Sequence, residues 1–384
     1  MPNILLLATA WGPKHGGINA FNMDFAAGLA GYLKPGGSVF CAVLDASRED
    51  CERARAFDIT LVPIRKDINT SSYDEDWAYT VWEGLPPKTS IDWWVGHDVT
   101  SAAAALKGPQ VAGAGHSAVI MHMNYADYVS YKRGSGAEAV RKERRQRQLF
   151  NRADKHFAVG PLLRDAMRDM VDHEITMLVP GFAEIEGRPA THALTLITFG
   201  RMDRESDRIK QGGLAVAGFA SAVRSAHQLG MPQLLRADPQ MRVIGISEEM
   251  GAEEVALRRF AHGKAGRVIN LLAQPFDEDR DALFDQLRRA NIALMLSWHE
   301  GFGLTGWEAI AAEVPLIVGR AACTVSSMIH WKIRGRHVSI PSTYRARRAM
   351  TILSTSRLLT KTPCARRLSK LPTTCRGRSG VRNT

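Results

Sequence analysis

A chain of 384 residues, of which 45% are hydrophobic and 23% charged, is long enough for two ordinary domains and has the composition of a soluble globular protein. No apolar run approaches the roughly 18 residues of a membrane-spanning helix, and the start lacks the basic segment of a signal peptide. The five cysteines are odd in number and lack metal-ligand spacing, which suggests a reducing cytoplasm and no disulfide framework.

The net charge of +11 is concentrated at the end of the chain. Residues 320–384 hold 15 of the 50 Lys and Arg residues and no Asp or Glu, so the other residues carry 35 basic and 39 acidic side chains. The body of the chain is therefore mildly acidic, and we expect no nucleic-acid partner for it.

Short apolar runs alternate with amphipathic stretches along the body, which is the pattern of βαβ units in parallel sheets. In the first half, the predicted strands are Asn3–Ala8, Ser38–Leu44, Ile59–Val62, Trp93–Val95, Ala118–His122 and His156–Val159. The predicted helices there are Ala20–Tyr32, Ser101–Leu106, Glu138–Asn151 and Pro161–Val171. We assign these elements to a first Rossmann-like domain over residues 1–185.

A second series of elements follows the Val179-Pro180-Gly181 break. Its predicted strands are Leu194–Phe199, Met241–Ile246, Val268–Leu272, Ile292–Leu296 and Leu316–Val318. Its predicted helices are Gly213–Leu229, Ala252–Ala261 and Asp277–Ala290. They indicate a second parallel-sheet domain over residues 186–319. Because ligands of such sheets bind outside the carboxyl ends of the strands, the expected site is a cleft between the two domains.

Residues 320–384 show no clean helical or strand period, and the composition changes abruptly after the predicted strand Leu316–Val318. One interpretation is a basic tail that binds nucleic acid or a membrane. The other, which we favour, is the product of a shifted reading frame, because the segment carries large apolar residues such as Trp331 and Ile333 that basic tails usually lack. On that hypothesis the second domain is incomplete at its C-terminus.

The first glycine-rich loop, Trp11–Asn19, follows a predicted strand and precedes a predicted helix. Gly16 and Gly17 would let the backbone approach a ligand closely. Taken alone, the same residues are better explained by an ordinary strand-to-helix turn.

Two histidines, His97 and His122, stand at the ends of strand-like runs. A neutral imidazole at such a place can hydrogen-bond a hydroxyl group or help to stabilise a cationic centre. A packed histidine with no role in chemistry is the commoner explanation of any lone histidine. Asp98 is a weaker companion candidate.

Two further signals carry less weight. Gly113–Ala118 matches G-x-G-x-x-A, but it precedes an apolar strand, whereas the dinucleotide-binding fingerprint follows one. The basic run Arg141–Arg147 on a predicted helix is typical of a solvated helix face, and the alternative is attraction to an anionic membrane surface or acceptor.

A pair of cations follows the first strand of the second series. Arg201 comes directly after Phe199-Gly200, and Lys210 precedes a predicted helix. Two cations at one end of a parallel sheet would neutralise an anionic ligand. When this stretch is taken alone, a solvated loop of basic residues is the favoured interpretation.

The most specific stretch begins where an apolar run ends in Glu300 and the turn Gly301-Phe302-Gly303, with a predicted helix after it. Glycine amides and a helix N-terminus together make a site for a diphosphate or a carboxylate. Glu300 and Glu308 could both accept hydrogen bonds from ligand hydroxyl groups. Thr305–Glu308 also fits S/T-x-x-E, so a helix capping box is an equal alternative for Glu308 taken alone.

The run from Glu300 to Leu304, followed by Glu308-Ala-Ile-Ala311 and Val314-Pro315, resembles the Glu–seven residues–Glu motif of retaining GT-B glycosyltransferases of family 4, also called group 1. The Arg201 and Lys210 stretch and the Trp11–Asn19 loop resemble further motifs of that family, in the same order. The resemblance covers roughly residues 3–319. It implies an α/β fold of the GT-B type, in which two Rossmann-like parallel-sheet domains face a cleft.

The resemblance also implies roles for individual residues. Glu300 would contact hydroxyl groups of the donor sugar, and Glu308 would hold the nucleotide ribose. His122 matches the cleft histidine of the family and is favoured over His97 for this reason. The implied catalytic residues are His122 and Glu300. The implied donor-binding residues are Gly16, Gly17, Arg201, Lys210, Gly301, Phe302, Gly303, Leu304 and Glu308.

The activity implied by the resemblance is the retaining transfer of a hexosyl group from a nucleotide-diphosphate sugar to an acceptor hydroxyl, without a cofactor or a metal ion. The acceptor would be a carbohydrate, a lipid-linked molecule or a small molecule. A peripheral membrane contact is suggested separately by the basic run Arg141–Arg147. The alternative is a non-catalytic nucleotide-sugar-binding protein with a degenerate transferase fold.

Overall fold

The computed structural model of the chain describes residues 1–64, 74–130, 136–181, 193–200, 207–230, 238–246, 251–275 and 279–319. Three sequence predictions lie outside these residues: the role of Arg201, the domain boundary between residues 185 and 186, and the nature of the basic segment 320–384.

The first half of the chain forms a seven-stranded parallel sheet with the strand order β3-β2-β1-β4-β5-β6-β7. The strands are β1 Asn3–Leu7, β2 Ser38–Val43, β3 Ile59–Pro63, β4 Trp93–His97, β5 His116–Met121, β6 Lys155–Val159 and β7 Ile175–Leu178. The order reverses beside β1, so the carboxyl ends of β1 and β4 border the crevice in which such sheets bind ligands.

The second half forms a five-stranded parallel sheet with the order β10-β9-β8-β11-β12. Its strands are β8 Thr195–Phe199, β9 Gln240–Ile246, β10 Asn270–Pro275, β11 Ile292–Met295 and β12 Leu316–Val318. Here the order reverses between β8 and β11, which places the loops after Phe199 and after Met295 beside each other.

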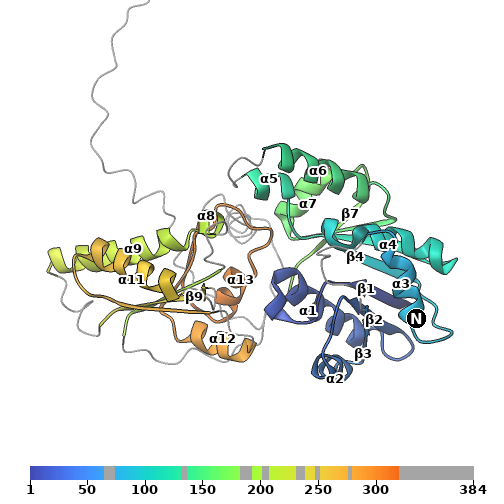
Figure 1. Cartoon of the computed structure of the whole chain (residues 1–384), viewed down its shortest axis with the longest axis horizontal. Helices are drawn as coiled ribbons and strands as arrows, with labels where there is room; N and C mark the ends of the chain where they lie inside the picture. The colour runs from blue at the N-terminus through green and yellow to red at the C-terminus, as the bar shows by residue number, and fades with distance from the viewer. Residues whose placement is uncertain are drawn as a thin grey trace, which may run out of the picture.

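Helices accompany both sheets. In the first unit they are α1 Gly17–Tyr32, α2 Arg48–Ala56, α3 Trp77–Gly84, α4 Asp98–Ala112, α5 Tyr125–Ser130, α6 Gly136–Phe150 and α7 Pro161–Arg168. In the second unit they are α8 Asp207–Lys210, α9 Gly212–Gln228, α11 Gly251–Ala265, α12 Arg280–Arg288 and α13 Leu304–Ala311. Figure 1 shows the two units side by side, with α1 on the side of the first unit that faces α12 and α13.

The cores lie on both faces of both sheets. Leu6 of β1 packs into one buried cluster, whereas its neighbours Leu5 and Leu7 pack into another, as the alternation of side chains along a strand requires. In the second sheet, the neighbouring residues Ile197 and Leu196 of β8 also pack into two different buried clusters. Burial on both faces explains why the strands read as nearly continuous apolar runs in the sequence.

All predicted strands overlap observed ones, and the α/β class with two parallel sheets is confirmed. Among the α-helices and strands described in the first unit, four were not predicted: α2, α3, α5 and β7. The signal for α2 is a capping box, in which Ser47 and Asp50 bond each other's backbone amides. The predicted helix Ser101–Leu106 is too short at both ends, because α4 runs from Asp98 to Ala112 and continues through Gly108 and Pro109, residues that usually disfavour a helix.

Gly108 of α4 packs against the fully buried ring of Trp94 on β4, where an added methyl group would overlap ring carbons. Gly108→Ala is therefore expected to lower the free energy of unfolding by about 1–3 kcal/mol, the usual cost of overpacking. The matched control is Gly28→Ala on the exposed face of α1, which meets no atom within 4 Å and is expected to stabilise by about 0.5–1 kcal/mol. Urea unfolding measures both, and a Gly108→Ala protein as stable as the wild type would contradict this packing.

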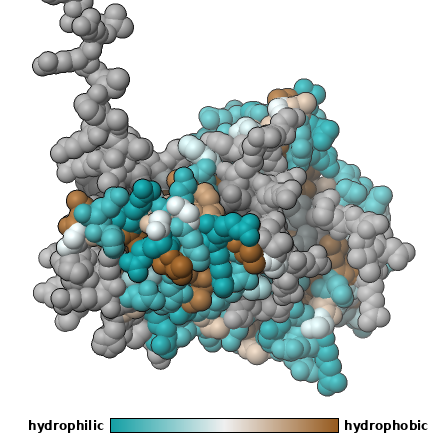
Figure 2. Space-filling model, turned by 60° about the vertical axis from the view of Figure 1, so that its left-hand side comes forward, coloured by the Kyte–Doolittle hydropathy of each residue, from teal (hydrophilic) through white to brown (hydrophobic). Residues whose placement is uncertain are grey.

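The surface of the described residues is mixed in polarity. Figure 2 brings the α9 and α11 side of the second unit forward and shows a largely hydrophilic surface with separate hydrophobic spots. Exposed large hydrophobic residues of this unit include Leu214, Leu229, Val255, Phe260 and Val268. Within the described residues, no helix has the length and apolar character that crossing a membrane requires.

Candidate functional site

A cavity of about 740 Å³ lies between the two sheet units. Loops at the carboxyl ends of β1, β4, β5, β8 and β11 line it, together with the starts of α1, α12 and α13. We call this cavity the cleft. The predicted site residues that line it are Gly16, Gly17, His122, Lys210, Glu300, Gly301, Phe302, Gly303, Leu304 and Glu308. The structure thus brings together every predicted site residue that it describes.

The glycine-rich loop after β1 forms one wall of the cleft. Gly16 has a φ of 99°, a conformation that favours glycine, and α1 begins at the next residue. Asn19 holds the loop, since its Nδ2 donates to the carbonyl of His15 at 3.0 Å and its Oδ1 accepts from the amide of Ala10 at 3.2 Å. The amides at the start of α1 are therefore fixed at the cleft, where the helix terminus favours a negatively charged ligand.

Lys210 and Glu300 form an ion pair inside the cleft. Their Nζ and Oε1 atoms lie 2.6 Å apart, and Ser297 Oγ donates to the same carboxylate oxygen at 2.7 Å. The two segments are joined because the amide of Trp298 donates to the carbonyl of Ile209 at 2.8 Å. A cation and a carboxylate from loops about 90 residues apart in sequence therefore face the same space.

The turn after Glu300 touches the first unit directly. A methyl group on Gly301 would overlap the backbone carbonyl of His122, so only glycine fits this approach. Phe302 is 5% exposed and packs into a core cluster of the first unit. Because the ring of Phe302 is used for packing, its backbone is the part that the cleft can offer to a ligand.

Glu308 is not part of a capping box. Gly303, with a φ of 87°, is the N-cap of α13, and no side chain caps the helix. Thr305 lies inside the helix, and its hydroxyl donates to the sulfur of Met295 at 3.7 Å. The capping-box alternative for Glu308 is therefore wrong, since the helix begins before the Thr305–Glu308 pattern does. Burial raises the pKa of Glu308 to about 7, against an opposing effect of the nearby Arg280.

The two histidines considered from the sequence lie side by side. His97 Nδ1 and His122 Nε2 are 2.8 Å apart, and His97 Nε2 lies 2.9 Å from Asn22 Oδ1. Asn22 Nδ2 donates to Cys41 Sγ, so its oxygen faces His97. An amide oxygen only accepts, so His97 Nε2 carries a proton and His97 Nδ1 accepts from His122 Nε2. His122 Nδ1 is then an acceptor.

Both imidazoles are neutral at physiological pH. Burial lowers the pKa of His97 to about 4. Burial, and then the neighbouring His97, holds the pKa of His122 well below its ordinary value. Asp98 fixes the backbone of His122, because its Oδ2 accepts from the His122 amide at 3.1 Å. Its Oδ1 accepts from Gln146 Nε2 at 3.1 Å. The pair is therefore a fixed, uncharged polar wall of the cleft.

Sequence reasoning missed Arg280, Asp24 and Asn22. Arg280 lines the cleft at the start of α12 and contacts Asp24 of α1, while Asn22 orients the histidines. The signal for Arg280 was its place just after a strand and at a helix start, where cleft residues of such sheets gather. Nothing in the local pattern of Asp24 or Asn22 distinguishes them from other polar residues of α1.

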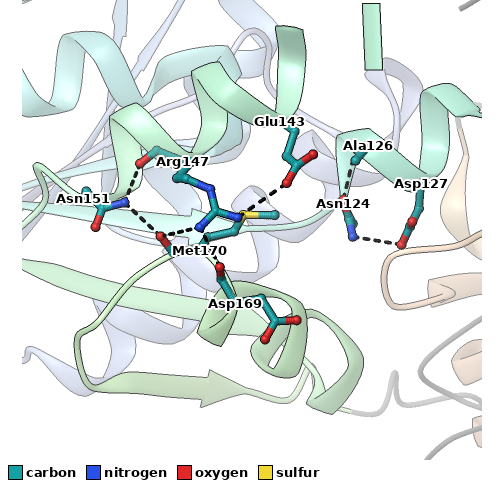
Figure 3. Close-up of polar contacts among 8 residues, drawn as sticks. All are labelled: Asn124, Ala126, Asp127, Glu143, Arg147, Asn151, Asp169 and Met170. Atoms are coloured by element: carbon teal, nitrogen blue, oxygen red, sulfur yellow. Dashed lines mark hydrogen bonds and ion pairs between the residues drawn. The ribbon is translucent and has the colours of Figure 1, made fainter. Parts of the chain in front are cut away.

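The basic run on α6 is partly structural. Arg147 donates to the carbonyls of Asp169 and Met170, at 2.6 and 3.4 Å, and lies 3.5 Å from the carboxylate of Glu143. Figure 3 shows these contacts. Asn151 adds a bond to the Met170 carbonyl at 2.9 Å. Arg147 therefore joins α6 to the end of α7. The remaining exposed basic residues of the run are Arg141, Arg144 and Arg145.

Comparison with known proteins agrees with this geometry. The sequence profile of a family described as "Family 4 Glycosyltransferase in conflict systems" matches residues 5–330. No curated protein matches the chain.

Several solved structures share the fold. Sucrose-phosphate synthase from Thermosynechococcus elongatus matches with a TM-score of 0.58 at 14% identity, over 87% of this chain and 90% of that one. Anabaena Alr3699/HepE in complex with UDP-glucose gives 0.59 at 12% identity, over 86% and 82%. TarM gives 0.57 at 10% identity, over 84% and 86%. At these identities the likeness shows the fold alone, which is GT-B.

The profile match covers most of the chain, and the two facing parallel sheets agree with it. The Glu300–Glu308 motif lies in the cleft between them. On this evidence, the chain belongs to the family 4 glycosyltransferases in conflict systems.

Proposed function

We propose that the protein is a retaining glycosyltransferase that moves a hexosyl group from a nucleotide-diphosphate sugar to an acceptor hydroxyl. The observation that carries this proposal is the pairing of Lys210 with Glu300 at 2.6 Å, at the start of the Gly301–Gly303 turn in the cleft. A cation and backbone amides suit a diphosphate, and carboxylates suit sugar hydroxyls. The site therefore complements both parts of a sugar diphosphate.

In this proposal the second unit binds the donor. Lys210 and the amides of residues 301–304 face the diphosphate, Glu300 accepts hydrogen bonds from sugar hydroxyls, and Glu308 accepts from the ribose. Negative charge grows on the diphosphate as the bond to the anomeric carbon breaks, and fixed cations and amides stabilise that charge. We assign Arg201 as a second cation on the basis of the family motif alone.

The first unit presents the acceptor in this proposal. The acceptor hydroxyl attacks the anomeric carbon from the face that the diphosphate leaves, and its proton passes to a diphosphate oxygen. The new bond then keeps the configuration of the old one without a carboxylate nucleophile. The neutral His122 offers Nδ1 to a sugar hydroxyl and places no positive charge near the oxocarbenium-like centre. Contact between the two units excludes water, which would compete with the acceptor.

A UDP-sugar is the first donor to test, since Alr3699/HepE of the same fold was solved with UDP-glucose. We propose a carbohydrate, lipid-linked or small-molecule acceptor. A peripheral membrane contact would use the exposed Arg141, Arg144 and Arg145 of α6. We assign no cofactor or metal to the reaction, and a rate that falls with EDTA would contradict this.

Thermal-shift measurements with UDP-, GDP-, ADP- and dTDP-sugars identify the donor. NMR of the product then gives the anomeric configuration, with Glu300→Gln as the inactive control. Retained configuration supports the proposal, whereas an inverted product overturns the mechanism. A wild-type protein that binds a nucleotide sugar but neither transfers nor hydrolyses it is the non-catalytic alternative.

Donor affinity is expected to increase as the pH rises through about 7. Burial raises the pKa of Glu308 to about 7, so its carboxyl group ionises as the pH rises through about 7. The ionised carboxylate is the stronger acceptor for ribose hydroxyls. Calorimetric titration of the donor at about pH 6 and about pH 8 measures the change. The Glu308→Gln variant should bind weakly at both values. A wild-type affinity that is the same at both would contradict the assignment of Glu308.

A further inference from the structure

A single arginine joins the two sheet units across the cleft. Arg280, the first residue of α12, donates from Nη1 to both carboxylate oxygens of Asp24 on α1, at 2.8 and 3.0 Å. Its Nη2 lies 3.6 Å from Oε1 of Glu308 on α13. The guanidinium therefore contacts one carboxylate from each unit.

The second unit fixes Arg280 on its own side. Asp279 caps α12 by accepting from the amides of Asp281 and Ala282, at 2.9 and 3.3 Å. The guanidinium of Arg280 lies 5.1 Å from the ring centre of Phe284, one helical turn further on. The side chain of Arg280 is 29% exposed, and that of Asp24 is 51% exposed. Contacts within the second unit therefore hold Arg280 in place, and Asp24 is the residue of the first unit that binds it.

The charges around Glu308 act in opposite directions. Arg280 lowers the pKa of Glu308 by charge and by hydrogen bonding, whereas Asp24 raises it. Asp24, Glu308 and Asp281 in turn raise the pKa of Arg280. The pKa of Glu308 therefore depends on how the Arg280 guanidinium is shared between Asp24 and Glu308.

We propose that Arg280 is a positioning residue that couples the closing of the two units to the carboxylate of Glu308 by dividing its guanidinium between Asp24 and Glu308. The planar fork of an arginine can serve two carboxylates at once, which a lysine cannot do in the same way. Asp24 holds Nη1 toward α1, and this orientation leaves Nη2 directed at Glu308. Because coupling between two binding events is reciprocal, donor binding at Glu308 favours closure to the same extent that closure favours donor binding. This last step depends on the proposed function of Glu308.

The first test needs no donor. ¹³C NMR of labelled glutamate carboxyl groups follows the titration of Glu308, and the Glu308→Gln variant assigns its signal. Removing the positive charge with Arg280→Gln should raise the titration midpoint, and removing the negative charge with Asp24→Asn should lower it. Opposite shifts support the proposal, whereas shifts in the same direction or no shift overturn it. Circular dichroism confirms that both variants are folded.

The second test uses the donor found by thermal shift. Asp24→Asn should lower donor affinity, because closure is weakened and closure and donor binding favour each other reciprocally. It should also lower kcat about tenfold, because the reacting groups of the two units are held together less firmly. Arg280→Gln should weaken donor affinity as well. Compared with Arg280→Gln, the Arg280→Lys variant should return the titration midpoint of Glu308 toward the wild-type value, because the positive charge is kept. Its kcat should stay low, because lysine lacks the planar guanidinium that binds two carboxylates at once. A wild-type kcat in Asp24→Asn overturns the coupling.

The two tests separate the inference from the proposed function. If the NMR midpoints shift as expected but the wild-type protein binds no nucleotide sugar, the shared guanidinium stands and the glycosyltransferase proposal fails. If the donor binds and reacts but the midpoints do not shift, the proposed function stands and the role of Arg280 is wrong.

Discussion

Lys210→Ala is expected to lower kcat for sugar transfer by about 10²–10³-fold, the usual loss when one group that stabilises transition-state charge is removed. Lys210 is the cation that the structure places beside Glu300 in the cleft, with its side chain 28% exposed. The charge on a departing diphosphate increases as the reaction proceeds. A cation fixed beside it therefore stabilises the transition state more than the bound donor, so kcat should fall more than donor affinity.

Loss of the Lys210 side chain also leaves Glu300 without its ion-pair partner, so the two effects have to be separated. Glu300→Gln removes the carboxylate alone, and the double variant shows how far the two residues act as a unit. Lys210→Arg should recover part of the rate because the charge remains. Lys107→Ala serves as the matched control, since Lys107 lies on α4 and bonds Gln110 outside the cleft. Steady-state kinetics measure all of these variants. A Lys210→Ala enzyme with the kcat of the Lys107→Ala control would remove Lys210 from the mechanism.

Short-range sequence patterns predicted the fold well because its strands are buried on both faces. Such strands are continuous apolar runs, and all predicted strands overlap observed ones. The edge strand β7 was missed because it is only partly buried, so its apolar run is weak. α2 was missed because it is strongly polar, although the Ser47 capping box marks its start.

The cleft was predictable where its residues belong to one continuous motif. Glu300, the glycine turn and Glu308 lie within nine residues and were assigned together. The roles assigned to them stay predictions. His97 and His122 were weighed against each other, whereas the pairing of β4 with β5 makes them hydrogen-bonding partners. No pattern along the chain reports that pairing.

Contacts between the two units were beyond sequence reasoning. Asp24 and Arg280 are 256 residues apart, and their meeting depends on how two complete sheets face each other.

Gly301→Ala is expected to lower kcat/KM by about 10²-fold while leaving each sheet unit folded. The added methyl group would overlap the backbone carbonyl of His122, which cannot rotate away as a side chain would. Leu163 lies 3.4 Å from the same position and limits movement in another direction. The clash can be relieved only if the Glu300 turn withdraws from the first unit.

That withdrawal would separate the donor side of the cleft from His122 and the acceptor side. Donor affinity should therefore fall less than the transfer rate, because the proposed donor contacts of Lys210 and Glu308 both belong to the second unit. Gly218→Ala, on an exposed face of α9 with no atom within 4 Å of the new methyl group, is the matched control. Transfer kinetics, donor titration and urea unfolding of the two variants distinguish displacement from misfolding. Wild-type transfer by Gly301→Ala would mean that the contact between Gly301 and His122 is not made in the reacting complex, and that the chemistry takes place with the two units further apart.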